Sequence, residues 1–339
     1  MQTHMITKPC RSLHRTIGLL QPKAYCVRLY SQSTQKAQST HDQSDGNNIS
    51  ATVDAPDKPA YKSATSFPWL LSKEEPRIPS YPYPSAPSMW SLLNYLPAFA
   101  QREMSKYLGT RMLRLNTGFS YFPEQFLIGA SLATRKALEI LSEDLTMGNK
   151  ESSEKLESTF SPALLQKLRD IRKEMDPNLN IDISIPQIYD ATIKDVWITL
   201  GTPRAFDNNR QFEVMQWMTL TVGVKAAKQT EEEENFSDYR GRVAKGLMDG
   251  AHFKVDVEID ADVEYTVSSP KLQEVGDADI LIHDRGRRPL IISFETPYFE
   301  PADRMVAGRD ENDEPIMDWN WRIADIDQLL AKEALEQES

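Results

Sequence analysis

The sequence predicts an α+β domain, in which helices pack on the concave face of a curved antiparallel sheet and form a cone. Two observations predict this fold. Apolar residues recur at the spacing of a helix up to Asp176 and at the spacing of a strand beyond it. The strands follow one another without the helical crossovers that a parallel sheet needs. A single domain over residues 119–332 fits the length of this pattern.

Three helices are predicted in the first part of the domain, and the first and third have an apolar stripe at spacings of three and four residues. They cover residues 123–148, 152–158 and 161–174. Pro123 suits the first turn of the first helix. Ser161 followed by Pro162 is a typical start for the third, because a serine hydroxyl can accept from a free backbone N–H of the first turn.

The strands are predicted from apolar residues that alternate with polar ones. They cover residues 188–200, 212–224, 255–267, 279–283, 290–296 and 317–323. The fourth and fifth are expected to form a hairpin whose loop is 284–289, which contains Gly286 and Pro289. A polar tail, residues 333–339, is expected to end the chain.

Five carboxylates share one face of the predicted strand 255–267, namely Asp256, Glu258, Asp260, Asp262 and Glu264. Such a row suits a basic partner or a cation. The alternative, which we favour, is a solvated outer face that also prevents edge-to-edge aggregation. The tryptophans at 197, 217, 319 and 321 are expected to fill the core of the sheet.

The amino-terminal residues 1–30 are predicted to be a mitochondrial transit peptide. The first 41 residues contain six Lys or Arg and no Asp or Glu, and they are rich in serine. Arg28 lies three residues before a candidate processing site, so the cut is expected between Tyr30 and Ser31. The alternative is a disordered basic tail. The sequence therefore predicts a protein of the mitochondrial matrix.

Residues 31–87 are rich in Ser, Thr, Gln, Asp and Pro, and we expect a disordered linker there. Residues 88–118 are predicted to be an amphipathic helical segment, which Pro97 kinks or ends. Its apolar residues are Met104, Leu108, Met112 and Leu115, and its basic residues are Arg102, Lys106, Arg111 and Arg114. Such a helix can lie on an anionic membrane surface, with cardiolipin the obvious matrix-side lipid. The alternative is a helix packed on its own domain with a solvated basic face.

Removal of residues 1–30 changes what chemistry the chain can perform. Both cysteines, Cys10 and Cys26, leave with the transit peptide, and 34 basic and 50 acidic residues remain, a net charge of -16. Disulfides, thiol catalysis and cysteine-based zinc sites are then excluded from the mature protein. Its acidity also argues against DNA as a partner, because binding to phosphates needs a basic surface.

The sequence gives little indication of catalysis. Of the histidines that follow the transit peptide, His41 lies in the linker, His283 is expected to be exposed at a strand end, and His252 is expected to have a capping or solvated role. We find no nucleotide-binding loop, nucleophile elbow or metal-spaced histidine pair. No cofactor or metal is predicted. A small-molecule-binding or isomerase-type cone stays as an alternative.

Three parts of the chain resemble a known family. Tyr121–Ala130 resembles the opening of the domain shared by the 44-kDa subunit of the inner-membrane translocase and its relatives. Phe212–Gly223 and Asp318–Ile326, with the closing pair Leu329-Leu330, resemble the last strands of the m-AAA protease-interacting protein family. The resemblance spans roughly residues 100–332, and its motifs are structural ones.

The resemblance implies a nuclear-transport-factor-like cone and a non-enzymatic protein on the matrix side of the inner membrane. Its relatives bind the m-AAA protease and support biogenesis of inner-membrane proteins, or dock the mitoribosome to the membrane. We therefore expect an adaptor or chaperone-like protein, peripheral to the membrane, whose partners are the m-AAA protease and inner-membrane clients. The alternative is a mitoribosomal component or receptor. The chain departs from the family by its segments near 229–250 and 284–315, which leaves the partner open.

Overall fold

The computed structural model describes residues 64, 68, 95–117, 123–147, 150–201, 212–225, 236–269, 279–313 and 315–338. All of them belong to one compact unit of the chain, Ala55–Ser339. The predicted transit peptide and its cleavage site, including Arg28, Tyr30 and Ser31, lie outside the described residues.

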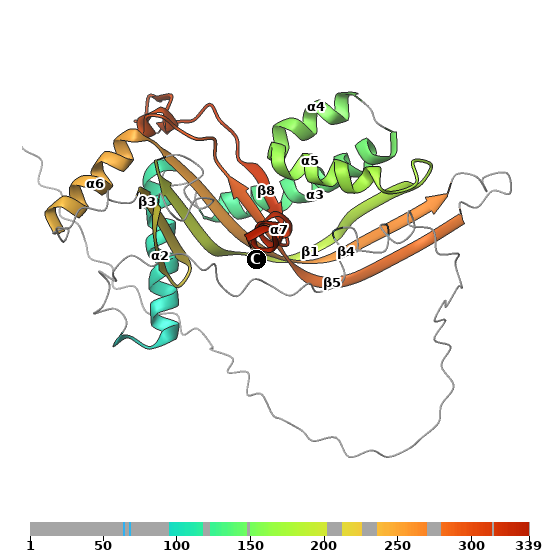
Figure 1. The fold of residues 1–339 in the computed structure, drawn as a ribbon, viewed down its shortest axis with the longest axis horizontal. Helices are drawn as coiled ribbons and strands as arrows, with labels where there is room; N and C mark the ends of the chain where they lie inside the picture. The colour runs from blue at the N-terminus through green and yellow to red at the C-terminus, as the bar shows by residue number, and fades with distance from the viewer. Residues whose placement is uncertain are drawn as a thin grey trace, which may run out of the picture. The chain divides into compact units, whose positions relative to one another are not determined.

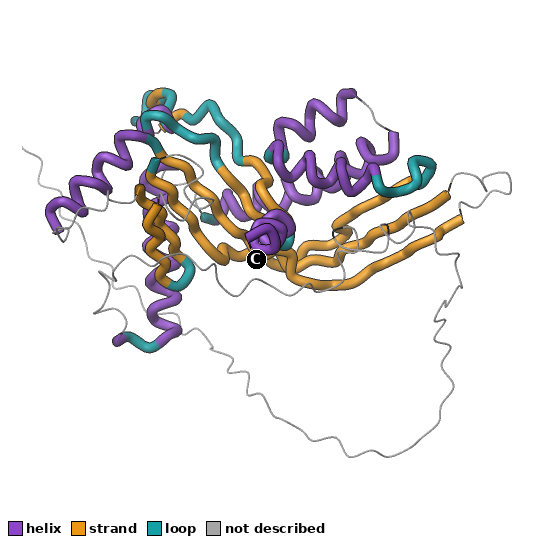
Figure 2. Tube along the Cα trace, in the orientation of Figure 1, coloured by secondary structure: helices purple, strands orange, loops and turns teal. Residues whose placement is uncertain are grey.

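A curled sheet of six strands forms the centre of the domain, in the order β2-β3-β1-β4-β5-β8 (Figure 1). The strands are β1 (Asn180–Leu200), β2 (Phe212–Trp217), β3 (Leu220–Lys225), β4 (Ala251–Ser269), β5 (Asp279–Glu295) and β8 (Arg322–Ile326). A separate pair is formed by β6 (Gly308–Arg309) and β7 (Pro315–Ile316). Helices and strands occupy separate parts of the chain for the most part, so the predicted α+β class is confirmed (Figure 2).

The sheet is mixed, because β3 runs parallel to β1 while the other neighbours are antiparallel. The predicted strand 212–224 is in fact a hairpin, β2–β3, which turns at Met218 and Thr219. Met218 has a φ of 52°, a conformation that is uncommon for a side chain of this size. A tight turn thus replaces the continuous strand that the apolar residues on both sides indicated.

The helices are α2 (Ala98–Thr117), α3 (Glu124–Met147), α4 (Lys150–Thr159), α5 (Pro162–Lys173), α6 (Phe236–Asp249) and α7 (Leu329–Glu338). The three predicted helices after Pro123 are confirmed as α3, α4 and α5. Ser161 caps α5, and its hydroxyl accepts from the backbone N–H of Leu164 at 3.3 Å.

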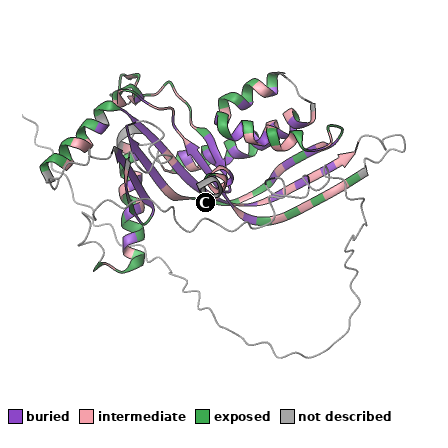
Figure 3. Ribbon diagram, in the orientation of Figure 1, coloured by how far each residue is buried: buried purple, intermediate pink, exposed green. Residues whose placement is uncertain are grey.

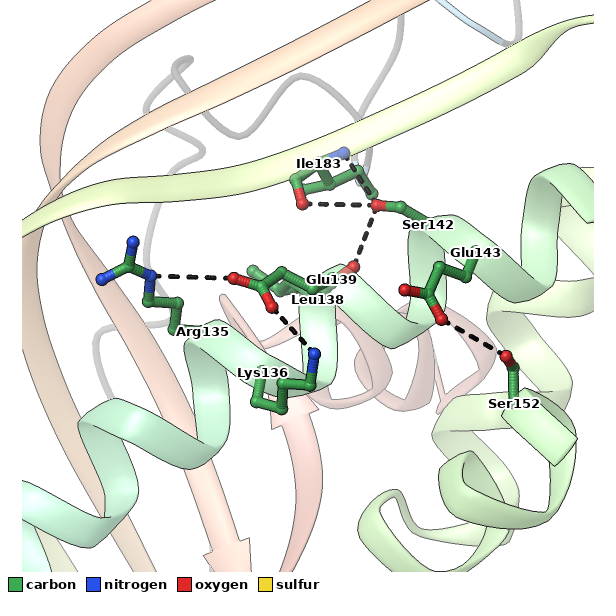
Figure 4. Close-up of polar contacts among 8 residues, drawn as sticks. All are labelled: Arg135, Lys136, Leu138, Glu139, Ser142, Glu143, Ser152 and Ile183. Carbon is green, nitrogen blue, oxygen red and sulfur yellow. Dashed lines mark hydrogen bonds and ion pairs between the residues drawn. The ribbon is translucent and has the colours of Figure 1, made fainter.

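Side chains of α3 complete the backbone pairing of β1, whose first half has no described strand on its outer side. The Ser142 hydroxyl accepts from the N–H of Ile183 at 2.8 Å and lies 3.3 Å from its carbonyl (Figure 4). Thr146, one turn later, makes the same two contacts with Ile181. Four residues of a helix and two residues of a strand both span roughly 6–7 Å. Side chains one helical turn apart on α3 can therefore reach alternate residues of β1.

The core lies between the concave face of the sheet and the helices. Alternate side chains of β4 are buried in it along the whole strand (Figure 3). Tyr265 is its largest fully buried side chain. Burial raises the pKa of Tyr265, whose hydroxyl donates to the carbonyl of Ala64 at 3.1 Å. Ala64 has an exposed fraction of 0 %, and Pro68 is also buried, so these two residues of the predicted linker 31–87 pack on the domain.

Three sequence predictions at the end of the chain are wrong. The predicted hairpin loop 284–289 is part of one continuous strand, β5, which pairs with β4 throughout. The last strand begins at Arg322, so Trp319 and Trp321 precede it. The predicted tail 333–339 belongs to helix α7 as far as Glu338.

Candidate membrane-facing surface on helix α2

Helix α2 lies against the sheet through small side chains. Pro97 comes just before the helix and accepts from its first turn, so it starts the helix and does not kink it. Ser105 and Leu113 have exposed fractions of 0 %, and Gly109 is buried between them. A Cβ atom added at Gly109 would lie 3.1 Å from the Cβ of Val196 in β1. The backbone of α2 therefore approaches the sheet closely at this position.

The stripe of methionines that the sequence indicated as the apolar face is exposed to solvent. Met104 and Met112 each have an exposed fraction of 39 %, and Leu108 is half-buried. Phe99 and Tyr107 are more exposed still, at 74 % and 60 %. The helix thus packs on its domain and also keeps apolar side chains in solvent, a combination that neither of the two sequence hypotheses described alone. Leu115 lies outside the residues whose side chains are described.

The four predicted membrane-surface residues all lie on this helix and reach solvent. Arg102 and Arg111 are exposed, and Lys106 and Arg114 are half-buried. Arg111 donates from Nη1 to the hydroxyl of Tyr107 at 3.3 Å, so an aromatic and a basic side chain lie together one turn apart. Tyr107 was not predicted as a site residue from the sequence. Its spacing of four residues from Arg111 was the available signal.

The turn between β2 and β3 lies beside this surface. The hydroxyls of Ser105 and Thr219 are 2.7 Å apart, and the N–H of Thr219 donates to the Ser105 hydroxyl at 3.2 Å. Met218, the residue before Thr219, has an exposed fraction of 40 %. We call the exposed side chains Phe99, Met104, Tyr107, Arg111, Met112 and Met218 the α2 surface. It joins aromatic and basic groups on an otherwise acidic chain.

Part of the predicted acidic row on β4 is buried. Asp256 has an exposed fraction of 6 %, because Trp197 donates to one of its carboxylate oxygens at 3.0 Å and Ser293 to the other at 2.6 Å. Asp195, its partner in β1, has its pKa raised to about 6 by burial and by the charge of Asp256, with Arg102 among the bases that oppose the shift. The expectation of a solvated face is therefore wrong at Asp256.

The two candidate histidines lie far apart on the sheet. His252 is buried, with Nε2 3.6 Å from Glu295, so the expected solvated role is wrong. His283 is exposed as expected, and its Nδ1 lies 3.3 Å from the Thr266 hydroxyl. Within the described residues no group of three or more His, Cys, Asp or Glu side chains is placed to hold a metal ion.

Aromatic side chains of α3, of β5 and of the segment before β8 pack together beside the sheet. Phe126 of α3 packs edge-on against Phe294 and Trp321, and Trp319 packs between Trp321 and Phe299. A cavity of about 540 Å³ opens to solvent next to this group, lined by Tyr298, Phe299, Glu300 and Arg304. The tryptophans at 319 and 321 therefore pack mainly against other core aromatics, as the sequence indicated.

No helix in the described part of the chain is long and apolar enough to cross a bilayer. No model of a known protein family matches the chain. No curated protein matches it significantly.

Proposed function

We propose that this chain is a non-enzymatic adaptor of the mitochondrial matrix, which lies on the inner membrane, binds the m-AAA protease and supports biogenesis of inner-membrane proteins. One observation carries the membrane part of the proposal, namely the α2 surface. A helix that is fixed to its domain through Ser105 and Gly109 has no structural need for exposed Phe99, Tyr107 and methionines. Exposed apolar groups of this kind mark an interaction site.

The composition of the surface indicates a lipid interface. Aromatic side chains favour the boundary between acyl chains and headgroups, and basic side chains bind anionic headgroups. Arg111 and Tyr107 are joined by a hydrogen bond, so both groups face the same side of α2. Each Lys or Arg near an anionic surface contributes on the order of 1 kcal/mol of binding free energy. This contribution is electrostatic, so we expect the protein to bind the membrane peripherally and salt to weaken the binding.

The partner in the proposal comes from the sequence resemblance, and the compartment comes from the composition of residues 1–30. The decisive experiment is affinity purification of the tagged full-length protein from mitochondria, combined with carbonate extraction. We expect the protease to co-purify and the protein to pellet with membranes but to be released by carbonate. A Tyr107→Ala, Arg111→Ala variant should shift to the soluble fraction.

The matched control for this variant is Tyr239→Ala, Arg240→Ala on α6, a helix outside the α2 surface. A wild-type protein that is fully soluble and brings down no protease would contradict the proposal. Recovery of large mitoribosomal subunits in place of the protease would favour the alternative, a ribosome receptor.

A further inference from the structure

The outer face of the long β1–β4–β5 ribbon is a second exposed surface, separate from α2. It faces away from the core residues of β4, because successive side chains of a strand point to opposite faces. A β-bulge between Ile188 and Asp190 interrupts this alternation in β1, so the neighbours Tyr189 and Asp190 both lie on this face. We call its exposed half, beyond the buried Asp256, the ribbon surface. Its members from β1 and β4 are Asp182, Tyr189, Asp190, Lys194, Glu258, Asp260, Asp262 and Glu264, and those from β5 are His283, Arg285 and Arg287. In Figure 3 the exposed and intermediate residues of this half of the ribbon alternate with buried ones.

A group of side chains that contact one another lies at the centre of the ribbon surface. The guanidinium of Arg287 stacks on the ring of Tyr189 at 3.9 Å and donates twice to Asp260, at 2.7 and 3.1 Å. The hydroxyl of Tyr189 donates to Asp262 at 2.9 Å. Tyr189 keeps an exposed fraction of 47 % and the Arg287 side chain 56 %. Both side chains therefore have intramolecular partners already before any other protein binds.

Such pre-ordering matters for binding. Tyrosine and arginine contribute most often to the energetically dominant part of protein interfaces. A side chain that is already fixed loses little conformational entropy when a partner arrives. A face that only keeps the protein soluble needs charges, but it does not need an exposed tyrosine locked by an arginine, as Tyr189 is by Arg287.

The charge of the ribbon surface is negative. It holds six carboxylates against three Lys or Arg, and two of these three bases are already engaged, Lys194 with Glu258 at 3.7 Å and Arg287 with Asp260. No ion pair joins Asp182 or Asp190 to a base in the described part of the chain. The sign of this surface disfavours nucleic acid and anionic lipid and complements a basic protein surface.

We infer that the ribbon surface docks a partner protein that presents basic side chains, with Tyr189 and Arg287 as the pre-ordered centre and Asp182 and Asp190 as the flanking charges. The inference goes beyond the proposed function and does not depend on it, because none of these residues belongs to the α2 surface. An adaptor with both surfaces has two separate surfaces of opposite charge, one for the membrane and one for a protein.

The experiment uses the full-length chain and a fluorescent poly-L-lysine of about 20 residues as the basic probe, with binding followed by anisotropy at about 50 and 150 mM salt. The test variants are Asp182→Lys, Asp190→Lys as a double substitution, and Tyr189→Ala alone. The control is Glu154→Lys, Glu174→Lys, which changes net charge equally at exposed positions of α4 and the end of α5. Thermal unfolding confirms that each variant folds.

We expect the ribbon double variant to weaken binding about tenfold or more, because two charge reversals act at the site itself. Tyr189→Ala should weaken it about threefold, and the control double variant less than about twofold, since a distant charge is screened over roughly 10 Å. Equal losses in the two double variants would show general acidity only and would overturn the inference. Absence of binding by the wild-type chain would overturn it as well.

Discussion

Ser105 of α2 and Thr219 of the β2–β3 turn share a hydrogen bond of 2.7 Å, although 114 residues separate them in the chain. Both side chains are buried, and the Thr219 N–H also donates to the Ser105 hydroxyl. This contact holds the turn that exposes Met218 against the helix that exposes Tyr107. It therefore joins the parts of the proposed membrane-facing surface.

Replacement of Ser105 should loosen this junction. In Ser105→Ala the buried N–H and hydroxyl of Thr219 lose their described partner, so we expect the free energy of unfolding to fall by about 2 kcal/mol. Chemical denaturation of the full-length chain measures it. Glu103→Ala, on the exposed side of the same helix, should change it by less than about 0.5 kcal/mol. Equal effects of the two variants would contradict the assigned packing.

The hydrogen bond from Tyr265 to Ala64 predicts that the region before α2 contributes to stability. Tyr265→Phe should lower the free energy of unfolding by about 1 kcal/mol, because the buried carbonyl of Ala64 loses its donor while the ring still fills the core. Ala64→Asp should cost more, since it buries a charge. Both values come from denaturant titration. An unchanged midpoint for Ala64→Asp would show that Ala64 is not buried in solution.

Asp195 predicts a specific dependence of stability on pH. Its pKa is raised to about 6 in the folded chain, by burial first and then by Asp256, against a usual value near 4. Between these pH values the folded state binds more protons than the unfolded state does. The free energy of unfolding therefore falls as pH rises from about 4 to about 6.

Asp195→Asn should therefore stabilise the domain by about 2 kcal/mol above pH 7, and this gain should vanish below about pH 4. Thermal unfolding across that range checks it. Thr192→Ala, exposed on the same strand and without a titrating side chain, is the control and should show no such pH dependence of the difference. A gain that persists at low pH would refute the assignment to Asp195.

Among the ion pairs of the described residues, the one between Arg288 and Asp327 should be the most sensitive to substitution. Both side chains are buried, and the Asp327 carboxylate also accepts from the N–H of Ile291 at 2.9 Å. Arg288→Leu removes a cation from beside this buried carboxylate, and we expect the free energy of unfolding to fall by about 3 kcal/mol in denaturant titration. The exposed neighbour Arg285 supplies the control variant Arg285→Leu, whose effect should stay below about 0.5 kcal/mol.

The regular elements were predictable because their signals are local. The alternation of apolar residues identifies β4, and Ser161 before Pro162 identifies the start of α5. The continuous strand β5 was not predictable in this way, since Gly286 and Pro289 together indicate a loop. Pro289 is tolerated because β8 pairs with β5 only from Ile292 onward, so no described ladder partner needs its missing N–H.

The sites depended on tertiary contacts that a single sequence does not show. The sequence indicated Met104 and Met112 as the apolar stripe of the amphipathic segment, whereas the helix packs through Ser105 and Gly109, whose small size permits close approach. The burial of Asp256 likewise depends on other strands, which bring Trp197 and Ser293 to its carboxylate. The alternation of residues within β4 alone therefore could not predict that Asp256 is buried.

Flotation with lipid vesicles tests the membrane-facing role of α2 most directly. The full-length chain is mixed with neutral vesicles or with vesicles that contain about 20 % cardiolipin. The variants are Arg111→Glu, Arg114→Glu on α2 and, as a matched control, Arg240→Glu, Lys245→Glu on α6. We predict binding to the anionic vesicles only, reduced about tenfold or more by the α2 variant and little by the control. Equal binding to neutral vesicles, or equal losses in both variants, would contradict the account.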